Sequence, residues 1–384
     1  MFKIIKKSKI SSARLGLLKT ASGDVKTPCF FPDATRGAIK HLSAEELEAL
    51  GLSGLVANTF HLHLRPGEKF INRAGGLHKF MNWPKPILTD SGGYQIFSLI
   101  HKKTGGGAID NSGAVFKSPL DGSRHKLTPE QSIKIQFKLG SDMIVCLDDC
   151  PANDSAAEKL KAAVDRTIVW AKRCRREYNK QLNLKRLSGG RPLLFAVAQG
   201  ADNFELRRHC ANELIKIGFD GFGFGARHLD QSGDFLEQTL EYTARLLPEN
   251  KPRFGLGIGS PEDIIRSIAL GWDMFDCVIP TREGRHGRLF FGKKTASGNF
   301  LVSVKNANKF YSAVNITNAK FSKDFSPINS ASRLKILREY SKAYLNYLFK
   351  IGEPLAARLA SLNNLEFYLK IMRDSRELIK TNKL

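Results

Sequence analysis

Acidic residues are few in this chain of 384 residues: Asp and Glu together number 37, against 60 Lys and Arg. The formal net charge is therefore +23. A charge this far from neutral repels itself unless an anionic partner or counterions offset it. We expect nucleic acid as the first candidate partner, with a merely basic soluble protein as the alternative.

Cysteines and long apolar runs are also scarce. The six cysteines form no C-x-x-C pair and no framework spacing, which in a long chain predicts reduced thiols rather than disulfides. The first ten residues carry lysines but no apolar run of signal-peptide length, and no window approaches about 18 uninterrupted apolar residues. We therefore expect a cytoplasmic protein with no membrane partner.

Eight short apolar runs bounded by turn residues are present instead. They lie at residues 28–31, 54–58, 86–90, 143–148, 193–200, 219–225, 253–259 and 273–278. Continuous apolar runs of this length are typical of strands that are covered on both faces.

Helix starts and stops lie between the runs. The capping pairs are Ser43 with Glu46, Thr128 with Gln131 and, more weakly, Ser260 with Asp263. Glycines stand at positions 140, 218 and 271, where these helices or their neighbours should end. Strand, capped helix and glycine, repeated about eight times, predict βα units that close into a parallel barrel.

An open, doubly wound sheet would give similar punctuation, so the position of the polar residues decides between the two folds. Five of them lie at or near the carboxyl ends of the runs, where barrel enzymes build their sites: Asn58, Asp90, Asp148, Gln199 and Asp276. We therefore predict an α/β fold, a (β/α)₈ TIM barrel with a small C-terminal helical subdomain. The catalytic core would span residues 1–280. Residues 281–384 would hold a basic segment and the helical subdomain, including the last barrel helix.

Two carboxylates that reach one cavity from different strands suit glycosidic chemistry. One can attack the sugar carbon while the other handles protons around an oxocarbenium-like transition state. Asp90 and Asp276 are the candidates, although a single strand-end Asp often only caps a helix or binds loop amides. A metal-dependent barrel hydrolase is a competing class, with His61 and His63 as ligands beside Asp276.

Five long motifs resemble the tRNA-guanine transglycosylase family, of bacterial type, in order and spacing. They are LTDSGGYQIFSL, FKSPLDGSRHKLTPEQSIKIQ, SDMIVCLDDC, VAQG followed by ELRR, and GWDMFDCVIPTREGR. The likeness runs from about residue 10 to about residue 370. It implies an enzyme without a cofactor that exchanges guanine at the anticodon wobble position of tRNA for a 7-deazaguanine in queuosine biosynthesis. The alternatives are a related enzyme that uses queuine or DNA, and a non-catalytic tRNA-binding subunit.

The resemblance also implies residue roles. Asp276 matches the nucleophile that attacks the ribose C1′, and Asp90 matches the residue that binds the purine edge and shuttles its proton. The remaining base-pocket positions are Asp148 and Gln199 on the base edge, Ser91 and Asn58 in the lining, Tyr94 and Leu256 on the two faces, Gly225 and Ala226 as backbone donors, and Cys150, which follows the bacterial pattern and favours 7-aminomethyl-7-deazaguanine.

A basic segment follows the nucleophile. Arg282 and Arg285 match family positions near the reacting nucleotide. With Arg288, Lys293 and Lys294 they are candidates for the path of the tRNA phosphates, although two lysines can also be an ordinary solvated charge run.

The chain departs from the family at a structural zinc site, where relatives carry C-x-C-x-x-C and a histidine. The four positions here are Ser332, Leu334, Leu337 and Asn363, none of which is a thiolate or imidazole ligand. We predict that no metal binds there and that residues 333–348 form one continuous helix with Ser332 as its N-cap. Tyrosines at 340, 344 and 347 would then lie on one stripe, where the family supports a homodimer.

Overall fold

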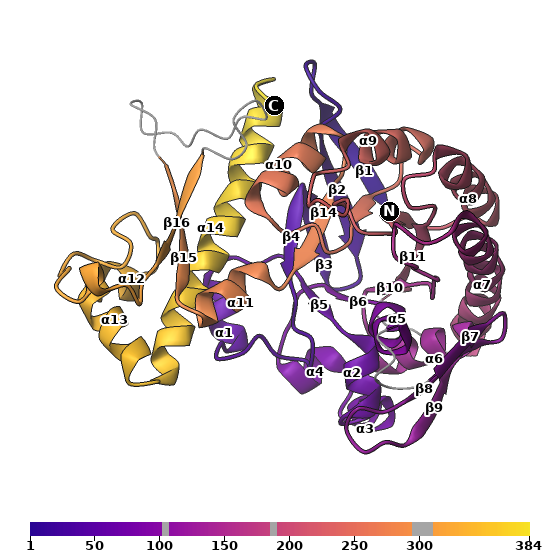
Figure 1. The fold of residues 1–384 in the computed structure, drawn as a ribbon, viewed down its shortest axis with the longest axis horizontal. Coiled ribbons are helices and arrows are strands. Elements are labelled where there is room, and N and C mark those ends of the chain that lie inside the picture. The colour runs from indigo at the N-terminus through magenta and orange to yellow at the C-terminus, as the bar shows by residue number, and fades with distance from the viewer. Residues whose placement is uncertain (102–106, 185–189, 294–309) are drawn as a thin grey trace.

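The computed structural model describes residues 1–101, 107–184, 190–293 and 310–384 (Figure 1). Its centre is an eight-stranded, all-parallel, nearly closed barrel, as predicted. The strand order is β4 (Cys29–Pro32), β14 (Met274–Cys277), β13 (Arg253–Gly255), β12 (Gly221–Phe224), β11 (Leu193–Ala198), β10 (Met143–Val145), β6 (Ile87–Thr89) and β5 (Leu55–Ala57). An isolated parallel bridge between Asp33 and Val56 joins the end of β4 to β5. Each strand lies in one of the eight apolar runs.

Helices follow the strands and cover the outside of the barrel (Figure 1). They are α1 (Ala44–Ala49), α2 (Thr59–Leu64), α3 (Glu68–Arg73), α4 (Leu77–Met81), α5 (Gly93–His101), α6 (Pro129–Leu139), α7 (Ala157–Leu184), α8 (Phe204–Ile217), α9 (Glu237–Leu246), α10 (Pro261–Ala269) and α11 (Ile279–Arg285). Among the described residues, no helix is long and apolar enough to cross a membrane.

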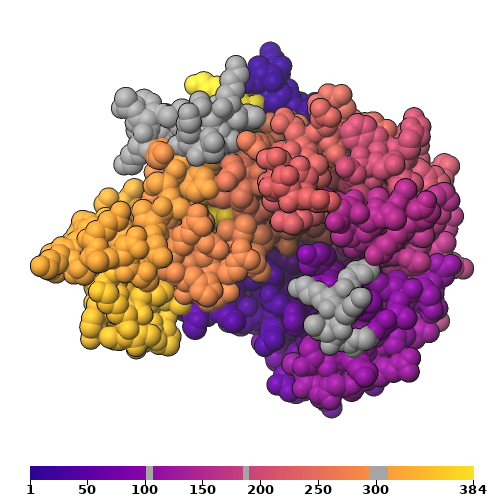
Figure 2. Space-filling view, in the orientation of Figure 1, coloured from indigo at the N-terminus to yellow at the C-terminus, as the bar shows by residue number. Residues whose placement is uncertain are grey.

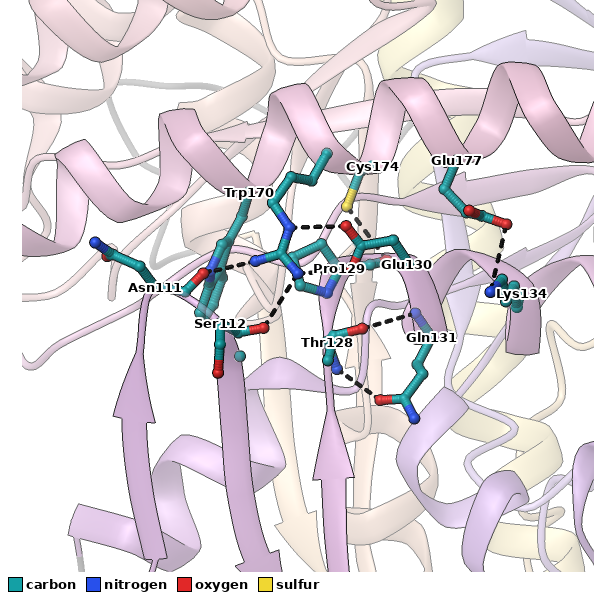
Figure 3. A network of polar contacts seen from close by, with 12 residues as sticks. Asn111, Ser112, Thr128, Pro129, Glu130, Gln131, Lys134, Trp170, Cys174 and Glu177 are labelled. Carbon is teal, nitrogen blue, oxygen red and sulfur yellow. Dashed lines mark hydrogen bonds and ion pairs between the residues drawn. The ribbon is translucent and has the colours of Figure 1, made fainter.

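The predicted capping boxes form at Ser43 and Thr128. Figure 3 shows the second of them, in which Thr128 and Gln131 exchange two hydrogen bonds at the start of α6. At α10 only half of the box forms: Ser260 Oγ accepts from Asp263 N at 3.2 Å, with no reciprocal bond from the shorter carboxylate. Gly140 and Gly218 end α6 and α8, as their positions predicted.

The side chains of the eight strands divide between two buried clusters. One cluster contains no helix residue and therefore fills the barrel interior; it includes Phe31, Val56 and Met274. Within a strand, the residues that alternate with these interior ones face outward; Phe30 of β4 and Phe275 of β14, for example, pack against the helices. Side chains alternate between the two faces of a strand. The residue two positions after the last interior residue of a strand therefore also points inward, at the carboxyl end of the barrel.

Among the described residues, eight further strands lie outside the barrel and were not predicted. They form the antiparallel sheets β1 (Phe2–Lys7), β2 (Arg14–Thr20) and β3 (Gly23–Thr27), then β7 (Gly107–Asp110), β8 (Gly113–Lys117) and β9 (Arg124–Leu127), and the pair β15 (Arg288–Gly292) and β16 (Tyr311–Asn315). Their sequences mix polar and apolar residues, so these strands contain no continuous apolar run by which they could be predicted. Phe2, Leu18 and Val25 of the first sheet join the interior cluster.

The predicted continuous helix at 333–348 is wrong. The chain forms two helices there, α12 (Lys335–Glu339) and α13 (Lys342–Lys350), after a short 3₁₀ turn, η2 (Ala319–Phe321). Tyr340 between them is extended, and Ser341 caps α13 by accepting from Tyr344 N at 3.1 Å. The hydroxyl of Ser341 therefore starts a new helix instead of continuing the old one. Leu334, not Ser332, is the N-cap residue of α12.

The long helix α14 (Pro354–Lys380) packs against α11, β15, β4 and α10, so it occupies the outer layer beside the last barrel strand (Figure 1). The ring of Tyr368 lies 4.8 Å from that of Phe30 on the outer face of β4. Its hydroxyl donates to Gly259 O at 2.7 Å. This helix thereby fixes the strands that carry the candidate nucleophile and its neighbour.

Candidate active site

The carboxyl end of the barrel gathers the polar residues that the sequence singled out. The alternation along the strands points Asn58, Asp90, Gln199 and Asp276 inward, and Asp148 is joined to Gln199 by a hydrogen bond. Figure 2 shows the molecular surface hollowed near its centre, where the indigo, purple and orange parts of the chain meet.

Asp276 lies in β14, two residues after the interior residue Met274. Gly257 N donates to its Oδ1 at 2.8 Å. Burial raises the pKa of Asp276 to about 7, and the nearby negative charge of Asp33 adds to the shift. At neutral pH this group is therefore about half ionised, and its ionised form is the one that can attack an electrophilic carbon.

Asp90 follows β6 and is held by three donors. Asn58 Nδ2 donates to Oδ2 at 2.5 Å, while the backbone amides of Thr59 and Gly92 donate to Oδ1 at 2.8 and 3.2 Å. Burial, together with the charges of Asp33 and Asp276, raises the pKa of Asp90 to about 7. The hydrogen bonds from the two backbone amides act in the opposite direction and lower it. A group that titrates near neutrality can both give and accept a proton in one catalytic cycle.

Asp148 and Gln199 form a second polar pair at the barrel mouth. Gln199 Nε2 donates to Asp148 Oδ2 at 2.6 Å, and burial raises the pKa of Asp148 to about 7. Cys150 lies beside them, and burial raises its thiol pKa to about 11, so it is a neutral lining group. The pair offers an acceptor and a donor to one edge of a ligand.

Gly225 and Ala226 at the end of β12 complete this side of the mouth. A Cβ on Gly225 would lie 2.5 Å from the Gln199 amide carbon, so only glycine fits there. Ala226 has φ +99°, a conformation that favours glycine. The following Arg227 is exposed.

Arg207 supports these loops and was not singled out as a site residue from the sequence. Its fully buried guanidinium donates to the carbonyls of Ala201 at 2.6 Å, Gly225 at 2.9 Å and Ala198 at 3.3 Å. It also lies 4.1 Å over the ring of Phe224. Arg207 thus ties the end of β11 to the end of β12; its only sequence signal is the ELRR motif that follows VAQG.

The apolar walls of the proposed base pocket differ in exposure. Tyr94 on α5 is 70% exposed, so its ring face is accessible at the mouth. Leu256 is half-buried against the interior cluster. Ser91 is buried, and its Oγ accepts from Gly93 N at 3.2 Å, which fixes the start of α5.

Asp33 is a further carboxylate at the mouth, in addition to Asp276, Asp90 and Asp148, and sequence reasoning missed it. It follows β4 directly, and its charge raises the pKa of both Asp90 and Asp276. The rule that selected the other residues, a polar side chain at the end of an apolar run, would have selected Asp33 as well.

The candidate phosphate-binding residues lie on α11 and β15. Arg282 and Arg288 flank the single carboxylate of Glu283, at 3.4 and 3.6 Å. Burial lowers the pKa of Arg285, and the charge of Arg282 lowers it further, while no acidic partner pairs with Arg285 in the described part of the chain. Lys293 is exposed. Lys294 lies outside the described residues. In the described part of this basic segment, cations thus exceed acids.

The positions that match the family's zinc ligands do not fit the metal in this chain. Leu337 is fully buried in the core. Ser332 Oγ donates to Glu366, and the Asn363 side chain accepts from Asn329 Nδ2 at 2.9 Å and donates to Phe290 O at 3.1 Å. No group of three or more His, Cys, Asp or Glu that could hold a metal ion occurs in residues 1–101, 107–184, 190–293 and 310–384. A leucine and a network of neutral and acidic side chains fill the space.

The competing hydrolase arrangement also fails to form. His63 Nδ1 lies 2.8 Å from Glu68 Oε2, and its ring packs edge-on against His125. The ring of His61 packs against Phe60. Neither histidine joins a metal-ligand group with Asp276 among the described residues.

An eight-stranded parallel barrel that gathers carboxylates and amides at the carboxyl ends of its strands is the architecture of a TIM-barrel enzyme. Comparison with known proteins narrows the class. The family model described as "Queuine tRNA-ribosyltransferase" matches residues 9–384. The chain belongs to this family, as its motifs predicted, and is therefore a pentosyltransferase.

Curated relatives support the same assignment over the full length. The queuine tRNA-ribosyltransferase of Caldanaerobacter subterraneus is 39% identical over 383 residues, which cover 100% of this chain and 94% of the relative. That of Enterococcus faecalis is 38% identical, with 100% and 93% covered. That of Dictyoglomus turgidum is 39% identical over 384 residues, with 100% and 92% covered.

Proposed function

We propose that this enzyme exchanges the guanine at the anticodon wobble position of tRNA for a 7-deazaguanine, with 7-aminomethyl-7-deazaguanine as the incoming base. The observation that carries the proposal is the position of Asp276. It is an inward carboxylate at the carboxyl end of the last barrel strand, with Asp90 in its electrostatic field. It would act in the cytoplasm, where tRNA is found.

The reaction is a double displacement. The Asp276 carboxylate forms a bond to the ribose C1′ while the glycosidic bond breaks, and the leaving guanine takes the bonding electrons and a proton from Asp90. The incoming base then returns a proton to Asp90 and attacks C1′, which releases the Asp276 ester. Two inversions give net retention at C1′. The pKa of Asp90, about 7, suits this giving and taking of a proton.

Base identity would be read by the second polar pair. A guanine edge presents N–H donors beside a carbonyl acceptor, and the pair of Asp148 and Gln199 offers the complementary groups. Ser91, Asn58, and the backbone amides of Gly225 and Ala226 would complete the edge contacts. Tyr94 and Leu256 would stack on the two faces. We assign the small 7-aminomethyl group because Cys150 follows the bacterial pattern.

The basic segment after the nucleophile would bind the tRNA backbone. We retain the division proposed from the sequence, with the catalytic core in residues 1–280 and the tRNA-binding segment and helical subdomain in 281–384. Arg282, Arg285, Arg288 and Lys293 are the described members of the phosphate path. Unstacking the target base costs a few kcal/mol, which phosphate contacts can offset.

A homodimer is the form that we propose for the working enzyme. Tyr344 and Tyr347 on α13 are 39% and 55% exposed, and Ile351, the C-cap residue of this helix, is 56% exposed. Exposed aromatic and aliphatic side chains on one short helix are typical of an interface. Light scattering at the assay concentration tests this point, since a monomer would contradict it.

The test of function is incorporation of radiolabelled guanine into unmodified tRNA. We expect label in the RNA with the natural enzyme and none with Asp276→Asn, because an amide is too weak a nucleophile to form the ester. The same variant should give no denaturation-resistant RNA adduct. Competition with unlabelled 7-aminomethyl-7-deazaguanine or queuine identifies the incoming base. Label in a DNA hairpin but not in RNA would support the DNA alternative, and no label in either would support a non-catalytic subunit.

A further inference from the structure

The backbone of Asp33 lies between the strand of the nucleophile and the strand that leads to Asn58. In the pairing of β4 with β14, Phe31 is opposite Asp276. Phe31 points into the barrel interior, so Asp33, two residues later, points to the same side at the mouth. On its other side, Asp33 bridges to Val56 of β5. The first register places this carboxylate on the strand next to that of Asp276, two residues beyond the position opposite it, and the second places it next to β5, which leads to Asn58.

The electrostatic interactions agree with this placement. The charge of Asp33 raises the pKa of both Asp276 and Asp90, so its carboxylate lies within range of both. Its own pKa is raised by burial. Asp33 thus belongs to the polar group that the substrate must enter.

Thr35 donates to the Asp33 carboxylate from its hydroxyl and its backbone amide, a local turn that uses part of the acceptor capacity of the carboxylate. The hydroxyl bond, from Thr35 Oγ1 to Asp33 Oδ1, is 2.9 Å long, and no cation forms an ion pair with Asp33 in the described part of the chain. No helix begins at Asp33, so it is not an N-cap. A half-buried, unpaired carboxylate beside two others lowers stability. A ligand that donates a hydrogen bond would offset that cost.

We propose that Asp33 is a specificity-determining residue that accepts a hydrogen bond from the ribose 2′-hydroxyl of the nucleotide under exchange. This inference rests on the proposed function, because it takes C1′ to lie at Asp276. The 2′-hydroxyl is attached to the carbon next to C1′, and neighbouring strands lie about 4.8 Å apart. A carboxylate on the strand beside the nucleophile is therefore within reach of that hydroxyl.

The chemistry favours this contact for two reasons. An ionised carboxylate only accepts hydrogen bonds, and the 2′-hydroxyl is the donor that distinguishes RNA from DNA. In glycosyl transfer, hydrogen bonds to the hydroxyl beside the reacting carbon strengthen as positive charge develops there. Asp33 would therefore act on the transition state more than on tRNA binding.

The test compares two anticodon stem-loop RNAs, one entirely ribose and one with a single 2′-deoxy sugar at the exchanged guanosine. Guanine exchange is measured with the natural enzyme, with Asp33→Ala and Asp33→Asn, and with Asp24→Ala at an exposed site on β3 as the control. We expect the natural enzyme and the control to prefer the all-ribose RNA by about 10- to 100-fold in kcat/KM, the size of one hydrogen bond to a charged group.

In Asp33→Ala this preference should fall close to one, because only the all-ribose reaction loses its contact. Asp33→Asn keeps an acceptor oxygen and should give an intermediate ratio. A preference that is unchanged in Asp33→Ala, or one that is absent from the natural enzyme, overturns the inference. The proposed function is judged separately, by whether the natural enzyme labels the all-ribose RNA at all. A melting curve confirms that each variant is folded.

Discussion

Replacing the proposed nucleophile, Asp276, by Asn should make the protein more stable while it abolishes exchange. In the folded protein, burial raises the pKa of Asp276 from 3.8 to about 7. An unfolded chain restores the ordinary value, so at high pH the folded state holds a carboxylate that it disfavours. Asn has nearly the same shape and no charge, and its side-chain oxygen can still accept from Gly257 N.

The size of the effect follows from the pKa difference. A shift from 3.8 to about 7 corresponds to about 4 kcal/mol, at about 1.4 kcal/mol for each pKa unit. Solvent at the barrel mouth screens part of this energy, and the new amide N–H groups of Asn need acceptors, at a cost of about 1–2 kcal/mol. We therefore expect Asp276→Asn to stabilise the protein by about 1–3 kcal/mol at pH 8.

The pH dependence gives the sign of the effect. A carboxyl with a raised pKa contributes stability at low pH that is lost as the pH rises from 3.8 through about 7. The advantage of Asn should therefore be largest above pH 7, shrink by more than half at pH 5, and vanish below about pH 4. This window comes from the two pKa values alone.

Urea unfolding at pH 8 and pH 5 measures the difference for the natural protein, for Asp276→Asn, and for Asp24→Asn as an exposed control. The control should shift neither midpoint. If Asp276→Asn is less stable than the natural protein at pH 8, or if its advantage is the same at both pH values, the burial argument is wrong. A variant that is both more stable and inactive also shows that activity was not lost through unfolding.

The remaining predictions concern other parts of the molecule. Asp90→Asn should lower kcat far more than tRNA affinity, since its work is proton transfer; weak tRNA binding with normal turnover at saturation would contradict this. The affinity for tRNA should fall steeply with salt, and Arg285→Ala should reduce the slope by about one released counterion, measured by filter binding; an affinity that does not depend on salt would mean that the basic surface serves another purpose. Arg207→Met should raise KM for guanine and lower the melting temperature, because three carbonyls lose their donor; unchanged values would remove its supporting role. Leu337→Ala should destabilise the protein by about 2–5 kcal/mol, while chelators leave the melting temperature unchanged; one tightly held zinc per chain in elemental analysis would refute the metal-free interpretation.

Local patterns predicted the barrel well. All eight barrel strands lie in the apolar runs, and the capping boxes at Ser43 and Thr128 form as expected. These features depend on residues within a few positions of one another, so they can be read directly from the sequence. Asp90 and Asp276 can be identified as candidates for one site in the same way, from their positions at the ends of apolar runs.

The C-terminal region shows where local patterns were insufficient. An apolar stripe at 333–348 is compatible with one helix or with two, and the choice depends on what surrounds Tyr340 and Ser341. The chain ends α12 because Tyr340 O accepts from Ile328 N at 2.7 Å, a contact with a separate segment. The substitutes for zinc ligands likewise depend on distant partners, since Ser332 and Asn363 bond to Glu366 and Asn329.

The sequence by itself determined the barrel class, the family and the carboxylates suited to glycosyl transfer, because strand runs, caps and long motifs are properties of contiguous residues. Only the tertiary structure decided which of these groups act together. Asp33 and Asp276 are neighbours because β4, near the start of the chain, pairs with β14, the last barrel strand. Arg207 on α8 reaches Gly225 because the ends of β11 and β12 lie side by side in the barrel. Burial at the closed barrel mouth also raises the carboxyl pKa values, and burial is a property of the assembled fold rather than of any segment.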